Sequence, residues 1–392
     1  MKQRTMVGLF AFVLAAGSVA PLFAADGVIK IGISSSKSGS YTSVGAIAKN
    51  GVELAKQEIN AQGLSIGDKT YTLEFIYVDN GSDRATASAN TLELIGQHQV
   101  IAIAGPQSSD RAIPVGEVAN AFRTPMVTTW ATAPEVTLNK SFVFRMTVMY
   151  DVQATAMTKF AAKEWQAGKA AVLYDEIHSD PAGMAKAFKT AFENANGAGS
   201  VVAFEAFRAD GTADFRKQLQ TIIKSDADFL FLPQYHRDIP EIVNQARKMG
   251  WQKPITGSNT WSVIDLVEKC GDACKGSFIT GNFAAGGAEG KAKAFTENYQ
   301  KQYKMLPDEV AALNYDAIYL IAESLKKIDA LTGNMVTDRL LLREQIARTN
   351  HFEGVAGMLA FPGTGDPAKC VILIKFDDNG VLTNYDKECP AN

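Results

Sequence analysis

Two short polar segments that follow apolar runs carry the residue types best suited to holding a small molecule. The run 100–104 is entirely apolar and is followed by Gly-Pro-Gln-Ser108-Ser109, where a helical pattern begins. A serine at the start of a helix lies beside backbone N–H groups without partners, an arrangement that binds an anion such as a carboxylate. An ordinary N-cap serine gives the same pattern, so this segment alone leaves both interpretations open.

The second segment follows the next apolar run along the chain. The run 126–130 ends in Thr-Thr-Trp130 and continues into Ala-Thr132-Ala-Pro. Neighbouring parallel strands end at the same edge of a sheet, and ligands of such sheets bind beyond that edge. We therefore expect the hydroxyl of Thr132 and the exposed backbone carbonyls of this segment to reach the same ligand as Ser109.

The sequence lacks the local motifs of common enzymes. It has no GxSxG, GxxxxGK[ST], GxGxxG or HExxH pattern. Its histidines, which folding could still bring together in a triad, are isolated from one another in the chain: His98, His178, His236 and His351. The cysteine spacings match no common zinc site. We expect a protein that is not an enzyme and that needs no metal and no cofactor.

The elements that position these segments alternate between strand and helix. The alternation runs from 29 to 130 and resumes from 151 to 257, where Asp151 is the predicted N-cap of the first helix. Two such arrays predict an α/β protein with two doubly wound parallel-sheet lobes. A chain of 392 residues also exceeds what one hydrophobic core usually serves.

The beginning of the chain has the pattern of a secretory signal peptide. Lys2 and Arg4 precede the apolar run 6–16, and small residues lead to a predicted cleavage site after Ala24. An uncleaved anchor is the alternative, although a spanning helix needs roughly 20 apolar residues. Cleavage would change the formal net charge from -3 to -5. An acidic surface argues against nucleic acid as a partner.

The four cysteines lie in the second half of the chain. Cys270 and Cys274 enclose a short loop, whereas Cys370 and Cys389 flank two runs separated by Asp-Asn-Gly, which predicts a hairpin. An exported protein meets oxidising conditions. We predict the disulfides Cys270–Cys274 and Cys370–Cys389, with free or differently paired thiols as the alternative.

The order and spacing of many segments resemble one known family. They include IKIGISSSKSGSYTSVG, NGVELAKQEINAQG, IAIAGPQSSDRAIP, TPMVTTWATAPEVT, AAVLYDEIHSDPAG, DFLFLPQY, ITGSNTW, LNYDAIYLIAESL and FEGVAGMLAF. Together they resemble the branched-chain amino-acid type of ABC-transporter binding protein, which has the type I periplasmic binding fold. The resemblance covers nearly the whole chain after the signal segment. It implies two lobes joined by three hinge crossovers, with ligand bound in the cleft between them.

The resemblance also implies lobe boundaries and binding residues. The N-terminal lobe is expected to comprise 27–147 and 282–357, and the C-terminal lobe 148–281 and 358–392. Ser109, with Ser108 beside it, is expected to bind the ligand carboxylate together with the Thr132 hydroxyl. The Trp130 carbonyl is expected to accept from a ligand amino group, and Tyr235 to reach in from the second lobe. Aromatic side chains that could stack on a ligand, or simply pack, are Tyr41, Trp130, Tyr150, Tyr235 and Trp261.

Two departures from the family pattern concern the charge of the ligand. Asn259 stands in Gly-Ser-Asn-Thr-Trp where the family usually has an acid that pairs with the ligand ammonium. Pro181 stands where the family usually has an aromatic residue after Ser-Asp. Asp180 is a candidate for the missing negative charge; otherwise the ligand lacks an ammonium group.

The expected function is that of a periplasmic receptor that passes a small solute to the permease subunits of an ABC importer. We expect a monomer and a carboxylate-bearing ligand, with a branched-chain or other neutral amino acid first and a non-amino organic or aromatic acid second. A ligand-sensing subunit of a signalling system is the rival function. A permease gene beside this one would favour transport, and a histidine kinase gene would favour sensing.

Overall fold

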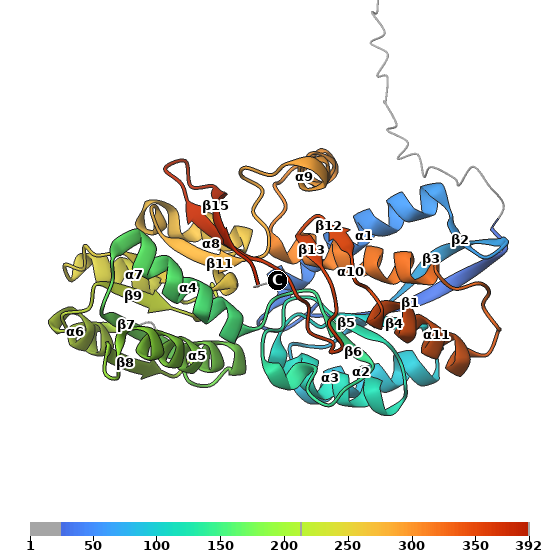
Figure 1. Ribbon diagram of the computed structural model, residues 1–392, viewed down its shortest axis with the longest axis horizontal. Helices are drawn as coiled ribbons and strands as arrows, with labels where there is room; N and C mark the ends of the chain where they lie inside the picture. The colour runs from blue at the N-terminus through green and yellow to red at the C-terminus, as the bar shows by residue number, and fades with distance from the viewer. Residues whose placement is uncertain (1–24, 212–213, 391–392) are drawn as a thin grey trace, which may run out of the picture.

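The computed structural model describes residues 25–211 and 214–390, which form two lobes (Figure 1). The predicted signal segment, 1–24, lies outside the described residues. Each lobe has one mostly parallel sheet with helices on both faces, as the alternating sequence pattern predicts. Among the helices of the described ranges, none has the length and apolar composition that crossing a bilayer requires.

The first sheet has the strand order β2-β3-β1-β4-β5-β6. Strand β1 pairs in parallel with β3 and β4, and short β2 joins the edge as an antiparallel hairpin with β3. The strands are β1 (Gly27–Ser35), β2 (Leu64–Ile66), β3 (Lys69–Asp79), β4 (Ala102–Ala104), β5 (Met126–Thr128) and β6 (Val143–Arg145).

Helices cover the first sheet because its strands are apolar on both faces. Ala102 and Ala104 of β4 pack into the core on the side of α1 (Thr42–Gln62) and α10 (Glu309–Leu325), whereas Ile103 packs on the other side. That other side is covered by α2 (Arg84–Gly96) and α3 (Ser109–Ala121). Successive side chains of a strand point to opposite faces, so an unbroken apolar run requires this double cover.

The second sheet has the strand order β15-β14-β11-β10-β9-β7-β8, in which only the β14–β15 end is antiparallel. Its strands are β7 (Ala170–Asp175), β8 (Val201–Phe207), β9 (Phe229–Leu232), β10 (Ile255–Gly257), β11 (Phe278–Gly281), β14 (Val371–Phe376) and β15 (Leu382–Glu388). Its helices are α4 (Tyr150–Trp165), α5 (Ser179–Asn196), α6 (Arg216–Lys224), α7 (Ile239–Lys248) and α8 (Ile264–Cys270).

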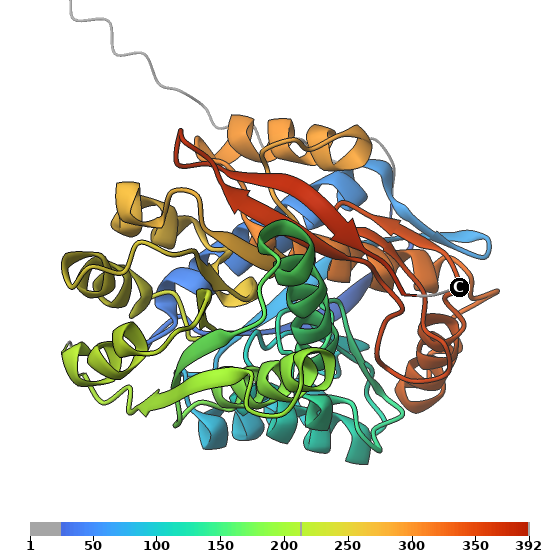
Figure 2. The same ribbon diagram turned by 60° about the vertical axis from the view of Figure 1, so that its left-hand side comes forward.

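Both predicted disulfides are present. Cys370–Cys389 closes the predicted hairpin, which is β14–β15, and Cys270–Cys274 joins the end of α8 to the turn that follows. The hairpin lies beside α4 (Figure 2), where Lys163 contacts Asp386 at 2.6 Å. One local prediction is wrong, because α4 begins at Tyr150 and Asp151 lies in its first turn instead of at the N-cap. An acid is favoured there by the helix dipole.

The chain passes between the two sheets after β6, after β11 and again before β14. The stretch between the second and third passages forms α9 (Gly290–Tyr303), α10 and α11 (Met335–Ala347), followed by the small hairpin β12 (Phe352–Gly354) and β13 (Gly357–Leu359). Tyr299 of α9 accepts a hydrogen bond from Asn50 of α1 at 3.2 Å, so this stretch returns to the first lobe. The exact lobe boundaries stay a prediction.

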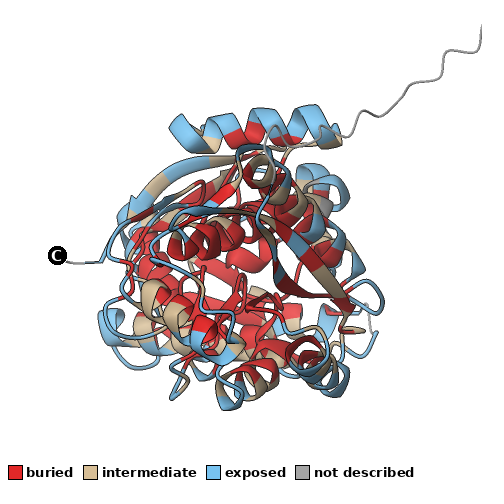
Figure 3. Ribbon diagram, turned by 90° about the vertical axis from the view of Figure 1, so that its right-hand side faces the viewer, coloured by how far each residue is buried: buried red, intermediate tan, exposed pale blue. Residues whose placement is uncertain are grey.

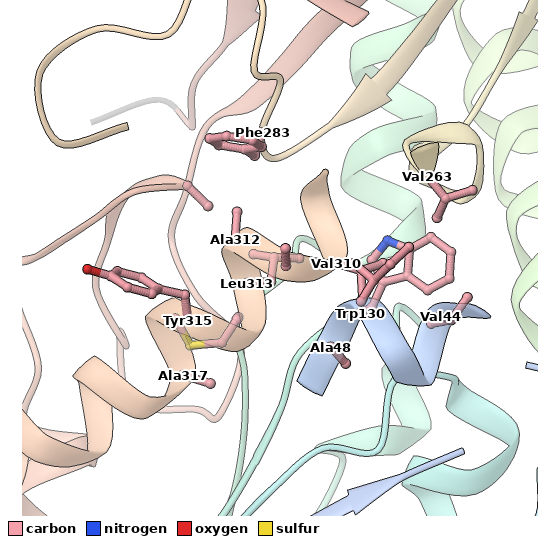
Figure 4. Close-up of a cluster of buried hydrophobic side chains, with 14 of the residues drawn as sticks. Val44, Ala48, Trp130, Val263, Phe283, Val310, Ala312, Leu313, Tyr315 and Ala317 are labelled. Carbon is pink, nitrogen blue, oxygen red and sulfur yellow. The ribbon is translucent and has the colours of Figure 1, made fainter. Parts of the chain in front are cut away.

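The buried residues lie between the sheets and their helices, and the outer helix faces are exposed (Figure 3). One hydrophobic cluster continues from the first lobe into the second. Within it, Trp130 is only 3% exposed and lies close to Val44 of α1, Val310 of α10 and Val263 of the second lobe (Figure 4). Burial of a large aromatic side chain at this junction stabilises contact between the lobes.

Candidate ligand-binding site

Polar residues that follow four parallel strands meet where the lobes face each other. Ser109 follows β4 and Thr132 follows β5 in the first lobe, while Asp180 follows β7 and Tyr235 follows β9 in the second. All four side chains are almost fully buried. The C-terminal ends of the strands of both sheets therefore converge on one point, as expected for a ligand site of doubly wound sheets.

The carboxylate of Asp180 is the centre of this group. Its Oδ2 accepts from the backbone N–H of Ser109 at 3.0 Å and from the hydroxyl of Tyr235 at 2.6 Å. Its Oδ1 accepts from the Thr132 hydroxyl at 2.8 Å, from the Thr132 N–H at 3.2 Å and from the Ser109 hydroxyl. The donors that the family resemblance assigns to a ligand carboxylate thus surround a carboxylate of the chain itself.

Ser109 is not an ordinary N-cap. Ser108 occupies the N-cap position of α3, with an extended backbone and no capping hydrogen bond from its side chain, and Ser109 is the first helical residue. The hydroxyl of Ser109 accepts from the N–H of Ala133 at 3.0 Å. Because its lone pairs face Ala133, its proton points to Asp180. Ser109 is thus not the N-cap, and its binding of a ligand carboxylate stays a prediction.

Two phenols and an imidazole line the same junction. The Tyr41 ring lies 5.2 Å from that of Tyr235 and 6.4 Å from that of His178, in edge-to-face contacts between the lobes. Burial raises the pKa of Tyr235, and the nearby Asp180 carboxylate raises it further. Burial likewise raises the pKa of Tyr41. Both phenols therefore keep their protons at neutral pH, and that of Tyr235 is donated to Asp180.

Several neutral polar atoms at this junction have no partner among the described residues. They are buried, and they belong to Tyr41 (Oη), Ser108 (Oγ), Thr129 (Oγ1) and Gln234 (Oε1 and Nε2). Buried polar groups without hydrogen bonds destabilise a protein by about 1–3 kcal/mol each. Such a group of atoms is characteristic of a site that completes its hydrogen bonds with a ligand or with water.

Asn259 belongs to a second polar group beside the first. Its Nδ2 lies 3.3 Å from Oε1 of Glu309, the first residue of α10. The same carboxylate accepts from the indole N–H of Trp130 at 3.1 Å and from Asn282, through its N–H at 2.7 Å and its Nδ2 at 3.0 Å. Burial raises the pKa of Glu309, while the hydrogen bonds from Asn282 oppose that shift.

The remaining aromatic residues divide between the junction and the lobes. The Trp130 ring lies 6.3 Å from Tyr235, and the backbone N–H of Tyr150 donates to the Thr132 carbonyl at 3.2 Å. Trp261 is fully buried inside the second lobe, where its indole donates to the Leu232 carbonyl at 2.8 Å. Trp261 therefore packs in the core and offers no surface for a ligand. The expected role of the Trp130 carbonyl stays a prediction.

A buried arginine fixes the segment that carries Thr132. Arg145 donates to the carbonyls of Ala131 at 3.1 Å and Ala133 at 2.9 Å, on either side of Thr132. Its Nε contacts Asp366 at 2.6 Å. Burial lowers the pKa of Arg145 and the Asp366 charge raises it. The guanidinium thus holds in place a segment that has no strand or helix of its own.

Arg111 is a site residue that the sequence analysis missed. Its guanidinium lies over the Tyr41 ring, 4.4 Å from the ring centre, and the residue is 3% exposed. Its Nε is buried without a hydrogen-bond partner, and Arg111 forms no ion pair within the described ranges. The sequence feature that could have identified Arg111 is its position two residues after Ser109, in the first turn of α3. An arginine on a helix is usually solvated, so its type and spacing alone did not indicate burial.

A hollow of about 840 Å³ lies elsewhere, on the first lobe. Its lining includes Glu58, Phe295, Tyr315, Asp316 and Lys291, from α1, α9 and α10. It contains none of the residues that the sequence predicted to bind ligand.

Comparison with known proteins agrees with this architecture. A family model described as Periplasmic binding protein matches residues 28–380. The chain belongs to the periplasmic binding protein family. The resemblance predicted from its sequence motifs is confirmed.

Relatives of this periplasmic binding protein match it over most of their length. It is 27% identical over 362 residues to the leucine-, isoleucine-, valine-, threonine-, and alanine-binding protein of Pseudomonas aeruginosa, covering 91% of this chain and 92% of that protein. It is 30% identical over 326 residues to the Leu/Ile/Val-binding protein BraC3 of Rhizobium johnstonii, covering 82% and 85%. The crystal structure of the substrate-binding protein LivJ of Streptococcus pneumoniae, in complex with isoleucine, superposes with a TM-score of 0.82 at 28% identity, covering 93% and 100%.

Proposed function

We propose that this periplasmic binding protein is the receptor of an ABC importer and binds a small carboxylate-bearing solute between its lobes. The observation that carries the proposal is the carboxylate seat formed by Ser109, Thr132 and Tyr235, whose donors converge on one carboxylate. Hydrogen bonds to an ionised acceptor are about twice as strong as neutral ones. A ligand carboxylate in this seat would contact both lobes and would hold them together.

A neutral amino acid, such as leucine, is the first candidate ligand. The relatives at 27–30% identity carry names that refer to leucine, isoleucine and valine. The ammonium group of an amino acid needs an anionic partner in a buried site. Asp180 can provide that partner once a ligand carboxylate takes over its hydrogen bonds with Ser109 and Thr132. Glu309 is less suitable, because four N–H groups already donate to its oxygens.

An organic or aromatic acid without an amino group is the second candidate. The observation that favours it is Arg111, a buried cation that has no ion pair within the described part of the chain and lies against an aromatic ring. A buried guanidinium without an anion is costly, and a ligand carboxylate would neutralise it. The rings of Tyr41 and Trp130, which both lie close to the Tyr235 ring, would pack against the body of an aromatic acid.

The proposal extends to the compartment and the partners. The N-terminal residues would direct export to the periplasm and would be removed there. The mature protein would act as a monomer and deliver its ligand to the permease subunits. Its acidic formal charge is consistent with a protein that has no nucleic-acid partner.

A thermal-shift screen tests the proposed function. Amino acids, benzoates and other small acids would be titrated against the mature protein, each paired with its uncharged amide or methyl ester. A ligand that binds only the folded form raises the melting temperature with dose, by about 2.7 kcal/mol of stability at 100 times Kd. We expect at least one carboxylate to do so and its amide to fail. If amides and esters stabilise the protein as well as the acids do, the carboxylate seat is not the ligand site.

A further inference from the structure

The hydrogen bonds of Asp180 cross from one lobe to the other. Asp180 belongs to α5 of the second lobe, and its partners Ser109 and Thr132 belong to the first. A neighbouring contact also joins the two lobes, because the Ser179 hydroxyl of the second lobe donates to Asp110 of α3 at 2.7 Å. The first turn of α5 is therefore bonded to the first turn of α3 across the ligand cleft.

These hydrogen bonds fully occupy the carboxylate of Asp180. A carboxylate offers about four lone-pair sites, and three donors reach Oδ1 while two reach Oδ2. The N–H and hydroxyl groups of Ser109 and Thr132 are occupied as well. A ligand carboxylate cannot use these donors at the same time, so ligand and Asp180 exclude each other from the seat.

A purely local role does not account for Asp180. An acid in the first turn of a helix usually interacts with the free N–H groups of its own helix. Asp83 does this at α2, where its side chain accepts from the N–H of Thr86. Asp180 instead bonds to residues 48 and 71 positions away along the chain and to Tyr235, 55 positions away. Its contacts with Ser109 and Thr132 exist only while the lobes are together, whereas Tyr235 belongs to its own lobe.

We propose that Asp180 is a tethered occupant of the carboxylate seat, which holds the ligand-free receptor closed and sets its specificity by competing with the ligand. This inference rests on the proposed function, because it assigns the seat to a ligand carboxylate. A carboxylate ligand binds by displacing Asp180. A ligand that cannot replace all these hydrogen bonds fails to displace it. Apparent affinity is reduced by the fraction of receptor whose seat is already filled.

Small-angle scattering of the ligand-free protein tests the closure directly. Asp180→Ala should increase the radius of gyration relative to wild type, because the bonds between the lobes are lost. Glu193→Ala is the matched control, since Glu193 lies on the same helix and its side chain contacts Lys189 and Gly199 of its own lobe. It should scatter like wild type. Melting curves would verify that both variants are folded. A folded Asp180→Ala variant with the wild-type radius would overturn the proposal.

Acetate supplies the carboxylate that Asp180→Ala lacks. Added acetate should return the scattering of this variant to that of wild type, whereas acetamide at the same concentration should not. If the open variant ignores acetate, the seat does not hold a carboxylate and the tethered-occupant proposal fails. Neither measurement requires knowledge of the natural ligand.

Calorimetry with leucine and benzoate separates this inference from the proposed function. If benzoate binds wild type, it should bind Asp180→Ala more tightly, by about tenfold if Asp180 fills the seat nine-tenths of the time. For leucine, the loss of the partner of its ammonium group opposes this gain, so the ratio of the two changes reports the two roles of Asp180. Weaker binding of benzoate by the variant would overturn competition. If neither probe nor any carboxylate of the screen binds either protein, the proposed function fails, while the scattering result still decides whether Asp180 closes the lobes.

Discussion

The backbone N–H of Ser109 lies 3.0 Å from the carboxylate of Asp180, and the Ser109 hydroxyl donates to the same carboxylate, although the two residues belong to different lobes. Ser109 is the first residue of α3 and Asp180 the second of α5. The N-terminal ends of two helices therefore face each other across the cleft. Because an anion is favoured at a helix N-terminus, one carboxylate between them interacts favourably with both.

Ser109→Ala should weaken carboxylate binding most strongly where Asp180 is absent. A charge-assisted hydrogen bond contributes about 1.5–3 kcal/mol, so in an Asp180→Ala background the loss should be roughly ten- to 150-fold in Kd. In the wild-type background the same change also weakens the competing Asp180, and the measured loss should be smaller. Calorimetry of the two single variants and the double variant gives this comparison. Equal losses in both backgrounds would show that Ser109 does not serve both carboxylates.

Asn259→Asp should destabilise the fold, even though it restores the residue type usual in the family. Asn259 donates to Glu309 across 3.3 Å, and an aspartate there would bring two buried carboxylates together. Like charges in a buried site repel strongly. We expect a loss of about 2 kcal/mol or more in the free energy of unfolding.

The double variant Asn259→Asp/Glu309→Gln is the control for this change. It exchanges the acid and the amide and should recover most of the stability in a denaturant titration. If Asn259→Asp alone unfolds like wild type, the contact with Glu309 has no energetic importance.

Arg145→Met should lower both stability and ligand binding. It leaves the carbonyls of Ala131 and Ala133 without their donor, and the segment that carries Thr132 loses its support. We expect a loss of about 3 kcal/mol in the free energy of unfolding, with weaker binding of any carboxylate ligand. Asp366→Asn keeps the guanidinium and its carbonyl contacts, so its loss should be smaller. If Arg145→Met and Asp366→Asn lose the same free energy of unfolding, the ion pair and not the carbonyl contacts accounts for the stabilisation.

Arg111→Met should affect function and stability in opposite directions. The change removes a buried charge that has no ion pair among the described residues, so the ligand-free protein should be at least as stable as wild type. Binding of an anionic ligand should weaken by tenfold or more, about 1.4 kcal/mol. Melting temperature and calorimetry on the same sample would show both effects. A clear fall in the melting temperature would indicate a structural arginine.

Asp308→Asn should flatten the pH dependence of stability between about pH 4 and pH 7. Burial raises the pKa of Asp308 from 3.8 to about 7. Between these values the folded protein holds a proton that the unfolded chain has released, so the contribution of Asp308 to stability falls as pH rises. The amide keeps the cap on the Ala311 N–H and does not titrate. The melting temperature, measured at intervals over this pH range, should fall less steeply with rising pH for the variant than for wild type. The same slope for both proteins would show that the pKa of Asp308 is not raised.

The alternation of apolar runs and helical stretches was enough to predict two parallel-sheet lobes, because each strand and helix follows its own local pattern. The hairpin closed by Cys370–Cys389 was predictable for the same reason, since its turn and both strands lie within one short segment. The convergence of Ser109 and Thr132 was also predictable, because adjacent parallel strands end at one edge. The wrong N-cap at Asp151 reflects a one-residue difference that local propensity does not resolve.

The sequence by itself thus determined the elements, the lobes, the disulfide-closed hairpin and the strand ends that carry Ser109, Thr132 and Tyr235. Only the tertiary structure decided that Asp180 fills the carboxylate seat, that Asn259 donates to Glu309 and that Arg111 is buried over Tyr41. The physical reason is the distance along the chain over which each kind of interaction acts. Periodicity and turn chemistry act over a few residues, whereas these pairs lie 50 to 71 positions apart in the chain and meet only when the lobes come together or when α3 packs beside the start of α1.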